Sequence, residues 1–273
     1  MRKRQSPKRK VSKKKEQAPK PTVEILPIEY ETQAIEETAN VLFKPNKGPQ
    51  TDFLAAAERE VLYGGSAGGG KSYAMLADPL RYMGHPAFSG LLLRHTTEEL
   101  RELVFKSQEL YPKIWPGIKW SERKMQWTAP SGARLWMSYL DRDDDVLRYQ
   151  GLAFSWIGFD ELTQWSTPYA WNYMRSRLRS TAPDLPIYMR ATTNPGGRGH
   201  HWVKKTFIDP APYNRAFDAT DTDTGDVLRY PAGHEKAGRS LFKRRFIPAR
   251  LSDNPYLAES GDYEAMLLSM PEQ

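Results

Sequence analysis

Short apolar segments alternate with amphipathic segments along the middle of the chain. Four segments have the apolar content of buried strands: Glu60–Tyr63, Ser89–Arg94, Ala153–Phe159 and Ile187–Thr192. The segments between them predict helices at residues 71–83, Thr96–Leu110 and 168–179, the second of these with Thr96 or Thr97 as its N-cap. Strands that alternate with helices are typical of an α/β fold built on a mostly parallel sheet.

One region departs from this alternation. Lys124–Thr128 and Ala133–Tyr139 both favour strands, and they flank the turn-forming sequence Ala129-Pro130-Ser131-Gly132. A connection this short allows only antiparallel pairing of the two strands. We therefore predict a mostly parallel sheet flanked by helices, with an antiparallel hairpin added to it.

The net charge of +7 is concentrated at the N-terminus of the 273-residue chain. Residues 1–20 hold ten Lys or Arg and one acid, which leaves 40 − 10 = 30 basic and 33 − 1 = 32 acidic residues elsewhere. Such a tail is predicted to be disordered, and residues 21–250 form the predicted folded domain. The tail could bind nucleic acid by counterion release, act as a solubilising terminus, or serve as a nuclear-localisation signal.

The composition excludes several classes of protein. No apolar run approaches the roughly 18 residues of a membrane-spanning helix, and no apolar segment follows the basic N-terminus as in a secretory signal. The absence of cysteine excludes disulfides and thiolate zinc sites, which fits a reducing compartment. We expect no membrane partner.

A complete phosphate-binding loop, G-x-x-x-x-G-K-[ST], follows the first predicted strand. It consists of Gly65, Ser66, Ala67, Gly68, Gly69, Gly70, Lys71 and Ser72. Glycines let the backbone N–H groups turn inward toward phosphates, Lys71 can reach the β- and γ-phosphates, and the Ser72 hydroxyl can ligate Mg²⁺. The sequence therefore predicts a nucleoside triphosphate and Mg²⁺ as ligands.

A pair of acids follows another predicted core strand. The strand that ends at Phe159 delivers Asp160 and Glu161 at its carboxyl end, which is the Walker B arrangement. Asp160 can hold Mg²⁺, directly or through water, beside Ser72. Glu161 can polarise the attacking water as a general base, so the sequence predicts hydrolysis in addition to binding.

Other candidates flank these acids. Arg148 precedes the Asp160 strand and could stabilise charge that develops on the γ-phosphate; Arg142, Arg175, Arg177 and Arg179 are rivals for that role. Thr192, Thr193 and Asn194 end the next strand. Their short polar side chains could sense the γ-phosphate by hydrogen bonds, or they could simply form an Asn-Pro-Gly turn.

These motifs together resemble the ATPase domain of large terminase subunits, the DNA-packaging motors of tailed bacteriophages, with T4-like phages as the nearest group. The resemblance covers about residues 42–273 and rests on motifs in a fixed order: Gly48–Leu54, Gly65–Ser72, Leu92–Arg94, Thr96–Leu103, Ile157–Glu161, Ala191–Pro195, Phe246–Ala249 and Asp253–Leu257.

The resemblance implies an additional-strand P-loop NTPase fold with ATP and Mg²⁺ as cofactors. It implies that Gln50 reads adenine, that Phe53 packs on the base or in the core, and that Thr192, Thr193 and Asn194 couple hydrolysis to DNA movement. Ser66 stands where some relatives carry an arginine, which favours Arg148 acting in trans. The implied partners are double-stranded DNA, the portal protein, the small terminase subunit and a homo-oligomeric ring on the procapsid in the host cell cytoplasm.

Full-length members of this family carry a C-terminal nuclease domain. We expect residues 251–273 to be a linker toward such a domain, which would be truncated or encoded separately, and we expect no nuclease activity from this chain. Two other functions stay open. One is a helicase-like nucleic-acid-dependent ATPase, and the other is a nucleotide-gated assembly module without turnover.

Overall fold

The computed structural model describes residues 43–66 and 68–254. The predicted basic tail, the segment from residue 21 to residue 42 and most of the predicted linker lie outside the described residues, so these expectations stay predictions. Within the described ranges, no helix combines the length and the apolar character that crossing a membrane requires.

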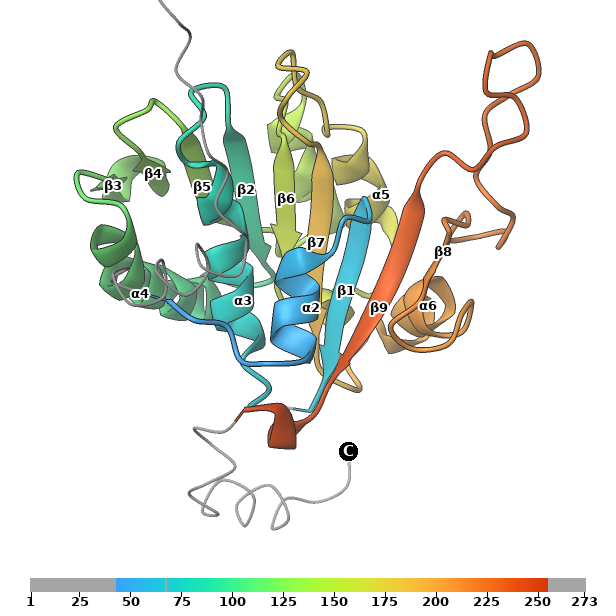
Figure 1. The fold of residues 1–273 in the computed structure, drawn as a ribbon, viewed down its shortest axis with the longest axis horizontal. Coiled ribbons are helices and arrows are strands. Elements are labelled where there is room, and N and C mark those ends of the chain that lie inside the picture. The colour runs from blue at the N-terminus through green and yellow to red at the C-terminus, as the bar shows by residue number, and fades with distance from the viewer. Residues whose placement is uncertain (1–42, 67, 255–273) are drawn as a thin grey trace, which may run out of the picture. The chain divides into compact units, whose positions relative to one another are not determined.

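A nine-stranded sheet crosses the domain in the order β3-β4-β5-β2-β6-β7-β1-β9-β8 (Figure 1). The strands from β5 to β9 in this order pair in parallel, while β3, β4 and β8 add antiparallel pairs at the two edges. Their bounds are β1 Glu60–Gly65, β2 Ser89–Arg94, β3 Lys119–Ser121, β4 Gln126–Thr128, β5 Arg134–Tyr139, β6 Trp156–Phe159, β7 Tyr188–Thr193, β8 Ala216–Asp218 and β9 Lys243–Ala249. The predicted mostly parallel sheet with an antiparallel hairpin is confirmed.

Helices cover both faces of this sheet. In Figure 1, α2, α3 and α4 lie on the near face and α5 and α6 on the far face. The α-helices are α2 Pro49–Ala55, α3 Lys71–Ala77, α4 Thr97–Ile114, α5 Tyr169–Arg175 and α6 His200–Val203. The 3-10 helices are η1 Asp78–Tyr82, η2 Glu122–Lys124, η3 Asp143–Tyr149, η4 Leu162–Gln164 and η6 Leu251–Asp253, and η5 Lys204–Ile208 is a π-helix.

The helix predicted at residues 71–83 divides at Pro79. The α-helix α3 ends at Ala77, and the 3-10 helix η1 continues the chain, because proline has no N–H to donate to the preceding turn. The N-cap prediction for α4 is confirmed at Thr96, whose hydroxyl accepts the Glu99 N–H at 3.3 Å. The predicted strand at residues 153–159 and the predicted helix at residues 168–179 are both shorter in the structure.

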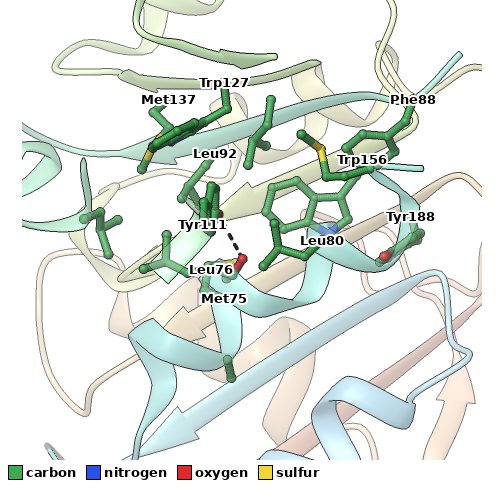
Figure 2. Close-up of a cluster of buried hydrophobic side chains, with 14 of the residues drawn as sticks. Met75, Leu76, Leu80, Phe88, Leu92, Tyr111, Trp127, Met137, Trp156 and Tyr188 are labelled. Atoms are coloured by element: carbon green, nitrogen blue, oxygen red, sulfur yellow. Dashed lines mark hydrogen bonds between the residues drawn. The ribbon is translucent and has the colours of Figure 1, made fainter. Parts of the chain in front are cut away.

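Two hydrophobic clusters lie on opposite faces of the sheet. Because successive strand residues face opposite sides, Val61 and Tyr63 join the cluster under α2, α3 and α4, while Leu62 joins the cluster under α5 and α6. Figure 2 shows the first cluster, in which the Tyr111 hydroxyl donates to the Leu76 carbonyl at 2.9 Å. This sandwich holds the strand ends in fixed positions.

The hydrophobic pattern of the sequence did not indicate strand β9. It begins with three cations, but Arg244 is fully buried and its Nε lies 2.7 Å from Glu60 Oε2. Arg175 Nε lies 2.5 Å from the other oxygen of Glu60. Burial acts to raise the pKa of Glu60, yet the two guanidinium groups lower it below its ordinary value. The three side chains therefore join β1, β9 and α5 as one ionic cluster, in which Glu60 and Arg244 are buried and Arg175 is partly exposed.

Glu60→Gln should destabilise the domain by about 3–5 kcal/mol, because it leaves the fully buried Arg244 and the partly buried Arg175 without their carboxylate. Wild-type stability should also fall in acid. The folded pKa of Glu60 is lowered, so its contribution is present above the unfolded pKa and is lost as the pH falls through the folded pKa. Chemical denaturation measures both effects. Glu109→Gln, at an exposed position of α4, is the control and should stay within about 0.5 kcal/mol of the wild type; equal losses in both variants would contradict the prediction.

Candidate nucleotide-binding site

The predicted phosphate-binding loop joins the carboxyl end of β1 to α3. Gly65 has φ of 139°, and a Cβ there would lie 1.9 Å from the Ala249 carbonyl oxygen of β9. Gly70 has φ of 73° at the position before α3. Only glycine is compatible with both the left-handed backbone and this close approach, so the glycines of the motif are a steric requirement.

A pocket of about 440 Å³ opens over this loop. Its lining combines most of the loop with one predicted catalytic acid and one predicted coupling residue. The lining residues are Gly68, Gly69, Gly70, Lys71, Ser72, Tyr73, Glu102, Lys106, Glu161, Asn194 and Asn254. Ala67 of the loop lies outside the described residues. The Ser66 N–H donates to the Ala249 carbonyl of β9 at 3.0 Å.

Lys71 lies folded back on its own loop. Its Nζ donates to the Ser66 carbonyl at 2.6 Å and lies 3.4 Å from the Gly65 carbonyl. Burial lowers the pKa of Lys71, and the nearby carboxylates of Glu161 and Asp160 oppose that shift. Carbonyl oxygens are weaker acceptors than phosphate oxygens, so an anion in the pocket would attract this ammonium group away from them.

Asp160 sits at the carboxyl end of β6 and is almost completely buried. The β6–β7 register pairs Phe159 with Ala191, which brings Thr192 beside Asp160, and the Thr192 hydroxyl donates to Asp160 Oδ1. On the other side, Arg94 Nε from the end of β2 lies 3.2 Å from Asp160 Oδ2. A hydroxyl and a guanidinium group from the two neighbouring strands thus hold this carboxylate.

The oxygen donors present fit a hard divalent cation. Ser72 lines the pocket, whereas Asp160 is not among its lining residues; Asp160 Oδ2 is buried and accepts no hydrogen bond. In the ranges that the structure describes, no group of three or more His, Cys, Asp or Glu side chains surrounds a single point. Mg²⁺ is commonly held by one or two protein oxygens together with phosphates and water, so this sparse donor set suits it.

Glu161 adopts a left-handed backbone with φ of 60°. Its N–H donates to Thr192 Oγ1 at 3.0 Å, and its carboxylate accepts the Asn194 N–H at 3.1 Å and the Asn194 side-chain amide at 2.7 Å. Burial and the adjacent Asp160 charge raise the pKa of Glu161, which Lys71, Arg94 and the Asn194 N–H partly offset. A pKa shifted toward neutrality suits a carboxylate that must accept a proton.

The predicted coupling residues divide into two groups. Thr192 and Asn194 contact the two acids directly, whereas the Thr193 hydroxyl donates to Thr163 Oγ1 of η4 at 3.0 Å. The end of β7 therefore contacts the two acids through Thr192 and Asn194, and it contacts η4 through Thr193.

The structure does not bring Gln50 or Phe53 to the pocket surface. Gln50 is buried; its side-chain oxygen accepts the Asn46 N–H at 2.6 Å and its amide donates to the Gly70 carbonyl at 2.9 Å. Phe53 is fully buried and stacks on Tyr63 with ring centroids 5.1 Å apart, so it belongs to the core. The adenine contact of Gln50 stays a prediction.

Arg148 lies on η3 and is not among the residues that line the pocket. Its side chain is about half exposed, and it donates to the Tyr139 carbonyl at 2.6 Å and to the Asp145 carbonyl at 3.2 Å. A role for Arg148 in its own pocket would require these bonds to break, and its role in trans stays a prediction.

Two residues that reach this site were not among the predicted site residues. Arg94 pairs with Asp160, and Asn254 donates its side-chain amide to the Gly68 carbonyl at 2.5 Å. The position of Arg94 at the carboxyl end of a parallel strand was a usable signal, because such ends meet at one edge of the sheet. Nothing in the sequence indicates that Asn254 folds back onto the loop.

Comparison with known proteins identifies the family. The model of the phage terminase large subunit family matches residues 57–231, which is more than half of the chain. A search of curated proteins finds no match.

Solved structures show the same fold. The large terminase of a thermophilic bacteriophage, in complex with ADP, is similar with a TM-score of 0.57 at 16% identity, over 84% of this chain and 51% of that chain. The large terminase ATPase domain of Thermus phage P74-26 gives a TM-score of 0.51 at 13% identity, over 84% of this chain and 90% of that domain. The fold is that of P-loop NTPases, and the chain spans about half the length of the first of these relatives.

Arg94→Gln should destabilise the domain by about 3 kcal/mol, because Asp160 would stay buried without its cation. Mg²⁺ should then raise the melting temperature of the variant more than that of the wild type, since the ion would no longer compete with a guanidinium group for the same carboxylate. Thermal unfolding with and without Mg²⁺ measures the difference. Arg101→Gln, at an exposed position of α4, is the control, and an equal response to Mg²⁺ in all three proteins would refute the competition.

Proposed function

The chain belongs to the phage terminase large subunit family, and from this premise we propose that it is an ATP-hydrolysing motor domain that drives double-stranded DNA into a procapsid. The observation that carries the proposal is the position of Glu161. This carboxylate of raised pKa lines the same pocket as Lys71 and Ser72 of the phosphate-binding loop, and Asn194 fixes both of its oxygens.

In the proposed reaction, water attacks the γ-phosphorus and Glu161 accepts a proton from that water. The bond between the γ-phosphorus and the oxygen that bridges it to the β-phosphate breaks, and that oxygen leaves with ADP. Lys71 and the amides of residues 68–70 bind the phosphate oxygens. Ser72 and Asp160 would hold Mg²⁺. When it is bound, this ion neutralises part of the negative charge on the phosphates. These assignments follow the Walker A and Walker B arrangements of the two segments.

Coupling to movement is proposed to run through β7. Thr192 bonds to Asp160 and Glu161, and Asn194 bonds to Glu161, so a change in charge or position at either acid alters the hydrogen bonds at the end of this strand. The register of β7 against β1 and β6 transmits such a change into the centre of the sheet. This fits the coupling role that the family resemblance implies for these residues.

The proposed partners are double-stranded DNA, the portal protein, the small terminase subunit and further copies of the chain in a ring, acting in the host cell cytoplasm. They follow from the family alone. A helicase-like ATPase would show turnover stimulated by single strands, and an assembly module would bind ATP without turnover. The intact set of Lys71, Asp160 and Glu161 favours turnover over mere binding.

Glu161→Gln should lower the rate of ATP hydrolysis by at least about 100-fold while ATP affinity stays within a few-fold, because the variant keeps the loop and loses the base. Wild-type turnover should fall as the pH falls through the raised pKa of Glu161. The ionised carboxylate destabilises the folded state above the unfolded pKa, so the variant should also melt at a higher temperature at neutral pH. Glu109→Gln is the control, and unchanged turnover in Glu161→Gln would refute the assignment of the base.

Arg148 acting in trans predicts complementation between two inactive variants. Arg148→Ala and Glu161→Gln should each have little activity, but a mixture should regain part of it, since some interfaces then join an intact Arg148 to an intact Glu161. Wild-type specific activity should rise with protein concentration. A mixture no more active than its components, together with concentration-independent turnover, would contradict an arginine in trans.

A further inference from the structure

Three side chains that line the nucleotide pocket have no part in the reaction proposed above. They are Tyr73 of α3 and Glu102 and Lys106 of α4, the helix that lies beside α3 on the near face of the sheet in Figure 1. Tyr73 directly follows Ser72 of the phosphate-binding loop. Glu102 and Lys106 are four residues apart on α4, so they share one face of that helix. This wall of the pocket therefore carries an aromatic ring, a carboxylate and an ammonium group.

Lys106 contacts both of the other side chains. Its Nζ donates to Glu102 Oε1 at 2.5 Å and lies 5.9 Å from the centroid of the Tyr73 ring. The side chain of Lys106 is 29% exposed and that of Glu102 is 64% exposed. An ion pair this open to solvent contributes little to stability, and the flexible stem of a lysine lets its ammonium group take other positions. Lys106 can therefore exchange Glu102 for a stronger acceptor that enters the pocket.

The Glu102–Lys106 pair lies on the side of the pocket that holds the hydrolytic acids. Lys106 lowers the pKa of Glu102 by its hydrogen bond and its charge, and the charge of Arg94 lowers it further. Burial raises the pKa of Glu161, and the same Arg94 charge opposes that rise. Arg94 Nε also lies 3.2 Å from Asp160 Oδ2. Because one guanidinium group is close enough to act on all three carboxylates, Lys106 lies toward the end of the pocket where the γ-phosphate is proposed to bind.

The charges at this end of the pocket make a second cation useful for binding a triphosphate. Among the described residues that line the pocket, the charged ones are Lys71, Lys106, Glu102 and Glu161. A γ-phosphate near Glu161 would meet two carboxylates, and like charges repel strongly in a partly enclosed site. Lys71 is one cation that opposes this repulsion. Lys106 is the other, and it already neutralises Glu102 where the two side chains lie.

We propose that Lys106 is a second phosphate-binding cation of this pocket and that it recognises the terminal phosphate of ATP. The inference rests on the proposed function, because it assumes a triphosphate whose γ-phosphate lies near Glu161. The Lys106 ammonium group leaves Glu102 and donates to an oxygen of the γ-phosphate, while the Tyr73 ring attracts the ammonium group and keeps it at the pocket wall. ADP has no γ-phosphate, so Lys106 makes the site prefer ATP to ADP.

Binding of two nucleotides tests this inference. The full chain is titrated by calorimetry in the presence of Mg²⁺, once with the non-hydrolysable β,γ-imido analogue of ATP and once with ADP. The quantity compared between proteins is the ratio of the two dissociation constants. The variants are Lys106→Gln, Lys106→Arg and Glu102→Gln. Lys113→Gln is the matched control, because Lys113 is an exposed lysine of the same helix that does not line the pocket.

Lys106→Gln should weaken binding of the ATP analogue about 10-fold and binding of ADP less than about 2-fold, because only the analogue has the phosphate that Lys106 contacts. Lys106→Arg should stay within about 3-fold of the wild type, since a guanidinium group also donates to phosphate. Glu102→Gln should act in the opposite direction and tighten binding of the analogue about 3-fold, because it removes the competing acceptor of Lys106. Lys113→Gln should bind both nucleotides like the wild type.

The outcomes separate this inference from the proposed function. A wild type that binds neither nucleotide would contradict the proposed function itself. If the wild type binds both, and Lys106→Gln changes the ratio of the two dissociation constants no more than Lys113→Gln does, the inference alone is wrong. Glutamine is a good helix former, so Lys106→Gln should fold at this partly exposed position. If it does not, Glu102→Gln decides, and an unchanged ratio in that variant overturns the inference.

Discussion

The pairing of β6 with β7 is the interaction on which the candidate site depends. It aligns Phe159 with Ala191, so the residues that follow this pair, Asp160 and Thr192, lie side by side. A slip of one residue would turn Thr192 to the other face of the sheet and leave both acids without their hydrogen-bond donors. The register is secured by strand residues that alternate between two hydrophobic clusters, so packing on both faces of the sheet determines where the carboxylates lie.

Local signals predicted the elements that carry local chemistry. The loop Gly65–Ser72, the strand Ser89–Arg94 and the Thr96 cap each depend on residues close together in the sequence, and the structure has all three. Strand β9 escaped prediction because its first residues are charged. Its burial becomes favourable only when Arg244 meets Glu60, which is distant in the sequence and adjacent in the sheet. The pattern of hydrophobic residues along the chain cannot predict an ion pair between two residues so far apart in the sequence.

The candidate site likewise contains residues that local motifs indicated and contacts that depend on the order of the strands. Asp160 and Glu161 could be recognised as a pair after a core strand, and the loop identified the pocket they would face. The pairing of Arg94 with Asp160 required the order of the strands, with β2 next to β6, which no motif states. For Gln50 the family resemblance implied a base contact, which stays a prediction; in the structure its side-chain amide group bonds to the Asn46 N–H and to the Gly70 carbonyl, and the sequence indicated neither bond. Motifs gave the residue types, and the sheet order decided which of them meet.

The contact of β9 and Asn254 with the phosphate-binding loop has a mechanical meaning. The Ala249 carbonyl accepts the Ser66 N–H, and five residues later the Asn254 side chain donates to the Gly68 carbonyl. The loop is thus tethered at two points to one stretch of chain. Tension along that stretch would act on the loop that we propose binds the phosphates, and a ligand that stiffens the loop would resist the tension in return. Tension on this stretch of chain and the binding of a nucleotide would then both act on the conformation of the same loop.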